Sequence, residues 1–134
     1  MSFSDFLNSR REAARALVSA LKQQYEYVSV LGADIKARAI RVDRNSSGIS
    51  SGRDTECGFV VKLSNGGAFF EYSLDDISGD VTALASRITS AFELNEALAG
   101  NMIDPVRLSD EPLVKSFDRE NDFDKYTEQQ LLDF

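Results

Sequence analysis

Apolar residues recur at helical spacing in the first part of the chain. The stretch from Ser4 to Gln23 contains neither Gly nor Pro, and one face of it collects seven apolar residues: Phe6, Leu7, Ala13, Ala14, Leu17, Val18 and Leu21. This spacing predicts an amphipathic helix with Ser4 as its N-cap. The charged residues fall mostly on the opposite face, which is typical of a solvated helix surface.

From Tyr25 the period changes toward two. The segment Tyr25–Val30 is rich in aromatic and β-branched residues and predicts a strand. The triplet Leu31–Ala33 contains a glycine and is expected to turn the chain. A second extended stretch is predicted from Asp34 to Asp43, where both faces are mixed, so the pattern leaves its register open.

The segment Arg44–Asp54 is polar and rich in Ser and Gly. It predicts either a loop or a weakly paired strand, and it contains no glycine pattern of a phosphate-binding loop. Next come two apolar segments, 57–63 and 68–72, joined by Ser64-Asn65-Gly66-Gly67. Such an Asn-Gly junction between apolar runs predicts a β-hairpin.

A second helix is predicted after the hairpin, with Ser78 or Asp80 as its N-cap. Its apolar face carries Val81, Leu84, Ala85, Ile88, Ala91 and Phe92. Beyond Gly100 the periodicity is lost. A third helix is expected to begin at Tyr126 with Thr127 as N-cap, and because its apolar face has only just begun at Phe134, we expect the chain to be the front piece of a longer protein.

This order of elements predicts an α+β fold, with a mostly antiparallel sheet of about four strands and two helices packed on one face. We expect residues 1–103 to form the α+β domain. Residues 104–134 are expected to form an acidic extended segment and the start of a further helix.

Charge is distributed unevenly along the chain. The 134 residues carry a net charge of −7, which disfavours independent binding to nucleic acid. Residues 34–54 nevertheless hold five basic and three acidic side chains, whereas residues 104–134 hold nine acidic and four basic ones. Three interpretations are open: the acidic segment lies over the basic strand within the same molecule, the basic side chains are simply solvated, or they form a site for an anionic ligand.

The residue inventory excludes several kinds of catalysis within this chain. There is no histidine, and Cys57 is the single cysteine, so neither a Ser-His-Asp triad nor a usual zinc site can be built. We expect no catalytic residue and no metal ligand. The Asp75-Asp76 pair admits a catalytic or cation-binding interpretation, but acidic residues before a helix are also favoured by the helix dipole. No signal peptide and no membrane-spanning run is found, which predicts a cytoplasmic location.

Residues from Tyr25 to about Leu98 resemble the N-terminal domain of the TldD/PmbA family, described as modulators of DNA gyrase and related to metallopeptidases. The resemblance lies in the opening helix and in three segments: Tyr25–Val30, the run from Ser51 to Phe70, and Ser73–Ser78 before an Ala-rich helix. Phe69 and Glu71 depart from the family pattern, which usually has Gly and a small residue after the hairpin.

The resemblance implies a two-domain protein whose active subunit carries His-Glu-x-x-x-His downstream, with zinc held by the parent protein or its partner subunit and not by this chain. It further implies a homo- or hetero-dimer formed through the missing C-terminal part, and an unfolded peptide as substrate. Within this framework we expect the segment 46–54 to line the peptide path, with Ser50, Ser51, Arg53 and Asp54 as peptide-binding residues. No nucleic acid and no membrane is expected as a partner.

Two other functions fit the sequence. A small acidic α+β chain also resembles secretion chaperones and adaptor domains, which bind a partner protein and catalyse nothing. A small-molecule enzyme that uses Asp75 and Asp76 would need a pocket beside them and at least one carboxyl group with a perturbed pKa.

Overall fold

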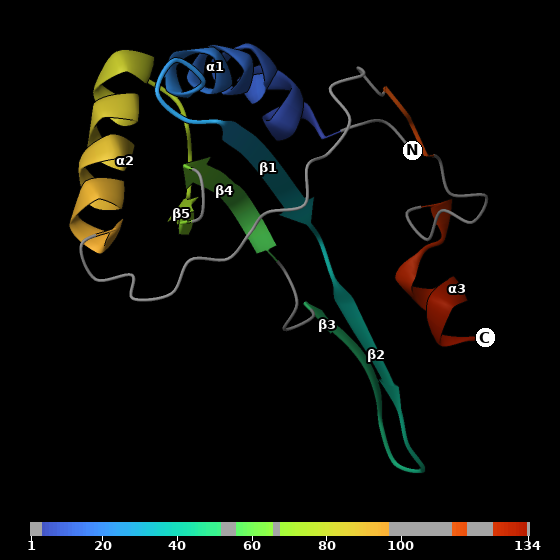
Figure 1. Ribbon diagram of the computed structural model, residues 1–134. Helices are drawn as coiled ribbons and strands as arrows, with labels where there is room; N and C mark the ends of the chain where they lie inside the picture. The colour runs from blue at the N-terminus through green and yellow to red at the C-terminus, as the bar shows by residue number, and fades with distance from the viewer. Residues whose placement is uncertain (1–3, 52–55, 66–67, 97–113, 118–124, 134) are drawn as a thin grey trace. The chain divides into compact units, whose positions relative to one another are not determined.

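The computed structural model describes residues 4–51, 56–65, 68–96, 114–117 and 125–133, and the chain divides into two compact units (Figure 1). One unit contains residues 4–34 and 57–109, and we call it the core unit. The other contains residues 1–3, 35–56 and 110–134, and we call it the ribbon unit. Each unit is described by itself.

The described residues form three helices and five strands. In chain order these are α1 (Asp5–Leu21), β1 (Tyr27–Ile35), β2 (Arg38–Val42), β3 (Ser47–Ser51), β4 (Glu56–Asn65), β5 (Ala68–Leu74), α2 (Val81–Glu96) and α3 (Glu128–Leu132). The predicted α+β class is confirmed. The strands form two sheets: a main sheet in the order β1-β4-β5, and a two-stranded sheet of β2 and β3.

The hydrophobic core lies between the main sheet and the two long helices. In β4 alternate residues Phe59, Val61 and Leu63 are buried, which places them on one face of the sheet. The same core cluster includes Leu17 and Leu21 of α1, together with Ile88 and Phe92 of α2. Both helices therefore pack on one face of the main sheet, as predicted.

Two helix starts in the core unit are fixed by local polar groups. The Ser4 hydroxyl accepts a hydrogen bond from the backbone N–H of Leu7 and donates one to the carboxylate of Asp34, which ties the start of α1 to β1. Of the two N-caps predicted for α2, Asp80 is the one observed, because its carboxylate accepts from the N–H groups of Thr82 and Ala83 at 2.8 and 3.3 Å.

The predicted turn at Leu31–Ala33 is wrong, because β1 continues through it to Ile35. A glycine is needed at position 32 because side chains from other elements pack closely against the strand there. A Cβ atom at this position would lie 2.8 Å from the ring of Phe59 and 2.9 Å from Leu7, closer than side-chain carbons approach each other. Because Gly32 has no side chain, Phe59 and Leu7 can pack directly against the backbone of β1.

The predicted hairpin at the centre of the sequence is confirmed as β4 and β5. These strands pair antiparallel, with Phe59 opposite Leu74 and Asn65 opposite Ala68. The glycines of its expected turn lie outside the described residues. On the sheet face opposite the helices, the rings of Tyr27 and Phe69 are 5.8 Å apart.

In the ribbon unit, β2 and β3 pair antiparallel and α3 contacts both strands. Thr127 is the N-cap of α3, as predicted, and forms a capping box with Gln130. The predicted domain boundary near residue 103 lies outside the described residues. No helix in the described part of the chain is long and apolar enough to cross a lipid bilayer.

Candidate functional site: a basic two-stranded ribbon

The β2–β3 pair, which we call the ribbon, is the most exposed paired structure in the described chain. All five residues of β2 are exposed. The strands align from Arg38 opposite Ser51 to Val42 opposite Ser47, with the Ile40–Ile49 pair at the centre. Of the two interpretations of the Ser/Gly-rich segment, the paired strand is therefore the one observed for Ser47–Ser51.

A tight turn closes the end of the ribbon. The backbone N–H of Asp43 donates to the carbonyl of Ser46 at 2.8 Å, and the Asp43 carboxylate accepts from the N–H groups of Asn45 and Ser46. These hydrogen bonds, the one from Asn45 foremost, lower the pKa of Asp43 below its usual value. The only acidic residue of the segment 36–51 is thus engaged in its own turn.

The turn also determines which backbone groups of β3 point outward. In an antiparallel pair, residues whose N–H and C=O face the partner strand alternate with residues whose groups face away. Because Asp43 and Ser46 are hydrogen-bonded, the alternation directs the N–H and C=O groups of Ser47, Ile49 and Ser51 away from β2. Since β3 has β2 as its only strand neighbour among the described residues, these groups form an open sheet edge.

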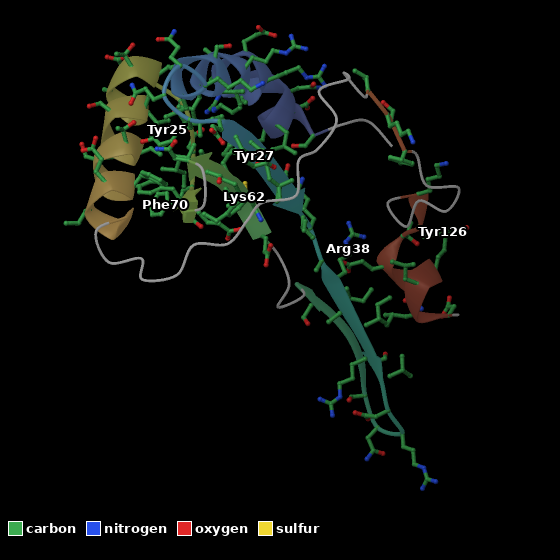
Figure 2. The ribbon with its side chains drawn as sticks, viewed as in Figure 1. Tyr25, Tyr27, Arg38, Lys62, Phe70 and Tyr126 are labelled. Carbon is green, nitrogen blue, oxygen red and sulfur yellow. The ribbon has the colours of Figure 1, made fainter. Side chains whose placement is uncertain are left out.

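Basic side chains follow the opposite strand and its ends. Lys36, Arg38, Arg41 and Arg44 are all exposed. Figure 2 shows that the Arg38 side chain extends from β2 on the side where α3 lies. Across the ribbon from these residues, β3 has only small side chains and Ile49.

The C-terminal helix lies against the ribbon. Leu131 is 6% exposed although its neighbours on this five-residue helix are exposed or half-buried, so it is the anchor of α3. α3 carries Glu128 in its first turn and ends at Asp133. The contact places residues 128–132 of the acidic segment against the two strands, and the rest of that interpretation stays a prediction.

The predicted peptide-binding residues fall partly on this ribbon. Ser50 is exposed and stands opposite Ala39, and Ser51 is the last residue of β3. Arg53 and Asp54 lie outside the described residues. By the alternation described above, the backbone groups of Ser50 face β2 and those of Ser51 face outward. Sequence reasoning did not single out Ser47 and Ile49, whose backbone groups also face outward, because that assignment requires the register of the strand pair.

The Asp75-Asp76 pair has a structural role through its second member. Arg10 on α1 makes a two-point ion pair with the Asp76 carboxylate, with nitrogen–oxygen distances of 2.6 and 2.9 Å. This carboxylate also accepts hydrogen bonds from Ile77 and Ser78. The hydrogen bond from Arg10, followed by that from Ser78, holds the pKa of Asp76 far below its usual value. Asp76 therefore stays ionised and links α1 to the segment before α2.

In a chain without histidine, the residue types that remain as metal ligands are Cys57 and the acidic side chains. Cys57 is the second residue of β4, after Glu56, and its side chain is exposed. Within the described ranges, no group of three acidic or cysteine side chains is placed to hold a metal ion.

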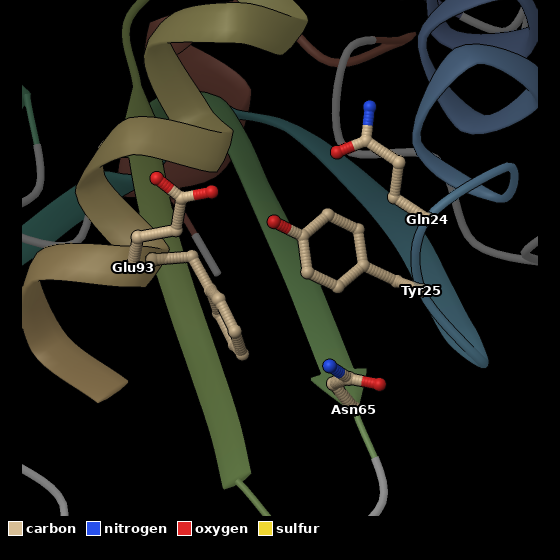
Figure 3. Close-up of a pocket in the computed structure, with 5 residues that line it drawn as sticks. Gln24, Tyr25, Asn65 and Glu93 are labelled. Carbon is tan, nitrogen blue, oxygen red and sulfur yellow. The ribbon is translucent and has the colours of Figure 1, made fainter. Parts of the chain in front are cut away.

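A small open pocket lies in the core unit, away from the Asp75-Asp76 pair. It has a volume of about 160 Å³ and is lined by Gln24, Tyr25, Asn65, Phe92 and Glu93 (Figure 3). Its aromatic residues Tyr25 and Phe92 meet edge to face, with ring centroids 5.0 Å apart. Pockets for small-molecule ligands usually measure roughly 300–1,000 Å³, so this hollow is too small for a typical substrate.

Comparison with known proteins does not assign the chain. No family model, no curated protein and no solved structure matches it. The case for a function therefore depends on the ribbon.

Proposed function

We propose that this chain is a non-catalytic domain that binds an extended peptide by strand addition along the outer edge of β3. In this proposal it is the N-terminal domain of a TldD/PmbA-like metal-dependent peptidase, or of its metal-free partner subunit, and acts in the cytoplasm on unfolded peptides. The observation that carries the proposal is the open edge of β3, where three successive outward positions present backbone N–H and C=O groups.

Strand addition suits this edge for a steric reason. A peptide that pairs with β3 must bring its backbone to about 4.8 Å from that of β3. The side chains of β3 are small except for Ile49, so the side chains of a paired peptide meet few bulky neighbours on this strand. Backbone pairing is also largely independent of the peptide's sequence, which is what a domain that handles unfolded chains requires.

The ribbon alone gives weak binding. Three outward residues offer three donors and three acceptors, and a hydrogen bond contributes about 1 kcal/mol net of its exchange with water. Ordering the peptide offsets much of this sum. We therefore expect the ribbon to bind peptides with low affinity and little sequence specificity. Other parts of a larger assembly that enclose the peptide would supply the remaining affinity.

The decisive experiment removes one outward donor. Ile49→Pro deletes an N–H that faces away from β2 and keeps the β2–β3 hydrogen bonds, whereas Gly48→Pro deletes one that faces β2. Binding of a fluorescently labelled unstructured peptide, followed by anisotropy, should fall at least severalfold with Ile49→Pro while the circular dichroism spectrum stays unchanged.

Ile49→Ala is the matched control, since it shortens the side chain and keeps the N–H. The proposal requires that it bind the peptide much more tightly than Ile49→Pro does. Equal binding by Ile49→Pro and Ile49→Ala would exclude strand addition at this edge. In the complete peptidase, alanine substitutions at Ser50, Ser51, Arg53 and Asp54 should raise KM for a peptide substrate with little change in kcat.

A partner-binding adaptor, similar to a secretion chaperone, is the alternative function. The observation that favours it is the exposed apolar surface on the main sheet, where Leu31 and Phe69 are 61% and 53% exposed. Secretion chaperones form tight homodimers on their own. Analytical ultracentrifugation of the chain separates the two functions, because a stable dimer favours the adaptor and a monomer favours the peptidase domain.

A further inference from the structure

The ribbon concentrates positive charge in a chain that is acidic as a whole. Among the residues that the structure describes, no carboxylate contacts Lys36, Arg41 or Arg44, and all three side chains are exposed. Asp43 is the one acidic residue of the segment 36–51, and its carboxylate is turned to Asn45 and Ser46. This segment is basic although the chain has a net charge of −7, so it can attract a negatively charged partner.

The register brings one of these cations within reach of the proposed peptide edge. Arg41 stands directly opposite Gly48 on β3. Because Gly48 has no side chain and nothing lies within 4 Å of where its Cβ would be, β3 has free space at that position. An arginine on β2 can therefore extend across β3 toward a peptide paired with its far edge.

One segment of the chain itself, α3, packs against the ribbon. α3 contacts both β2 and β3, is anchored by Leu131, and carries Glu128 and the flanking Asp133 with no basic residue between them. A short helix with an acidic residue at either end and two leucines, of which Leu131 is buried, therefore already lies against this basic structure. Charge and an apolar anchor are together compatible with the ribbon surface.

From these observations we infer that the ribbon selects acidic peptides, with Asp or Glu side chains of the bound strand facing Arg41 and Arg44. This inference rests on the proposed strand addition and names the class of peptide that it favours. Exposed ion pairs are weak one by one. We therefore expect a preference of roughly threefold to tenfold for an acidic over a neutral peptide near 0.15 M salt, where charges are screened beyond about 8 Å.

The test uses three labelled peptides of equal length and equal apolar content, in which the same four positions are Glu, Gln or Lys. Each is titrated against the chain, against the double variant Arg41→Gln/Arg44→Gln, and against Arg87→Gln. Arg87 is an exposed arginine on α2 in the core unit and serves as the matched control. A duplex DNA of similar length is titrated in parallel.

We expect the Glu peptide to bind best and the Lys peptide worst. The preference should disappear in the double variant and at 1 M salt, and persist in Arg87→Gln. Equal affinity for all three peptides, or a preference that survives in the double variant, would overturn the inference and leave strand addition intact. Tighter binding of the duplex than of the Glu peptide would also overturn it, since the cations would then serve a phosphate backbone. Failure of all three peptides to bind would instead remove the proposed function itself.

Discussion

The main sheet and the ribbon are both built from antiparallel pairs, yet they differ in what stabilises them. In β4 the side chains of Val61 and Leu63 are fully buried beneath the two long helices, whereas in β2 Val42 is 64% exposed and its neighbours are exposed as well. Apolar burial stabilises the main sheet. The ribbon depends on backbone hydrogen bonds, its turn and the contact with α3. In the ribbon, β3 keeps one edge without a strand neighbour among the described residues.

The largest effect that tests this contrast is a pair of truncations in equivalent elements. Leu63→Ala on β4 should lower the free energy of unfolding by about 2–5 kcal/mol, because it leaves a cavity in the core. Ile40→Ala on β2 should change it by less than about 0.5 kcal/mol, since Ile40 is 46% exposed. Urea unfolding followed by circular dichroism measures both, and equal losses would contradict the contrast.

A second pair exchanges two glycines for alanine. Gly32→Ala should destabilise the chain by about 1–3 kcal/mol, because the new methyl group meets Phe59 and Leu7 in a filled core. Gly48→Ala on the ribbon has open space around it and should leave stability unchanged or slightly raised. The midpoint of thermal unfolding of each variant measures these effects. An unchanged midpoint for Gly32→Ala would show that Phe59 and Leu7 can shift to accept the methyl group.

A smaller effect is expected at the N-cap of α3. Thr127→Ala removes the side-chain acceptor for the Gln130 N–H and should cost about 1 kcal/mol of helix stability. Because α3 belongs to the ribbon unit, amide exchange should quicken in residues 128–132 and stay unchanged in α2. Thr127→Ser keeps the hydroxyl and is the control. Faster exchange in α2 as well would mean that the two units unfold together.

The smallest effect concerns acid stability of the core unit. The pKa of Asp76 is lowered in the folded chain, so its ionised form favours folding. This contribution is complete above the ordinary aspartate pKa of about 3.9 and is lost as the pH falls from there toward the lower folded value. The stability difference between the wild type and Asp76→Asn should therefore shrink from pH 7 to pH 2.

Asp75→Asn is the control for this pH dependence, because it replaces the adjacent exposed carboxylate and keeps the ion pair with Arg10. The effect is modest because both partners of the pair are partly solvated. A difference between wild type and Asp76→Asn that stays constant down to pH 2 would contradict the assigned role of Asp76.

Features encoded by neighbouring residues could be predicted from the sequence. The N-caps Ser4 and Thr127 act on backbone groups within three residues, and the hairpin of β4 and β5 is announced by its Asn-Gly junction. The α+β class follows from the order of such elements. Gly32 misled the prediction because its reason lies in Phe59 and Leu7, which are distant in sequence.

The candidate site could be predicted only in part. The polar segment that contains Ser50 and Ser51 includes strand β3 of the ribbon, and its role in peptide binding stays a prediction. An exposed strand has no alternation of buried and exposed residues, so the sequence could not decide between loop and strand. The outward direction of Ser47 and Ile49 depends on pairing with β2, which no local pattern reveals.

The nested pairing of the strands has a consequence for the order of folding. β1 pairs with β4 across the intervening residues 36–55, and the ribbon is contained in that interval. The entropy lost on closing a loop increases with its length, so an unstructured interval would slow the meeting of β1 and β4. Once the Asp43 turn forms and β2 pairs with β3, the open loop is much shorter. We therefore expect formation of the ribbon to speed the pairing of β1 with β4.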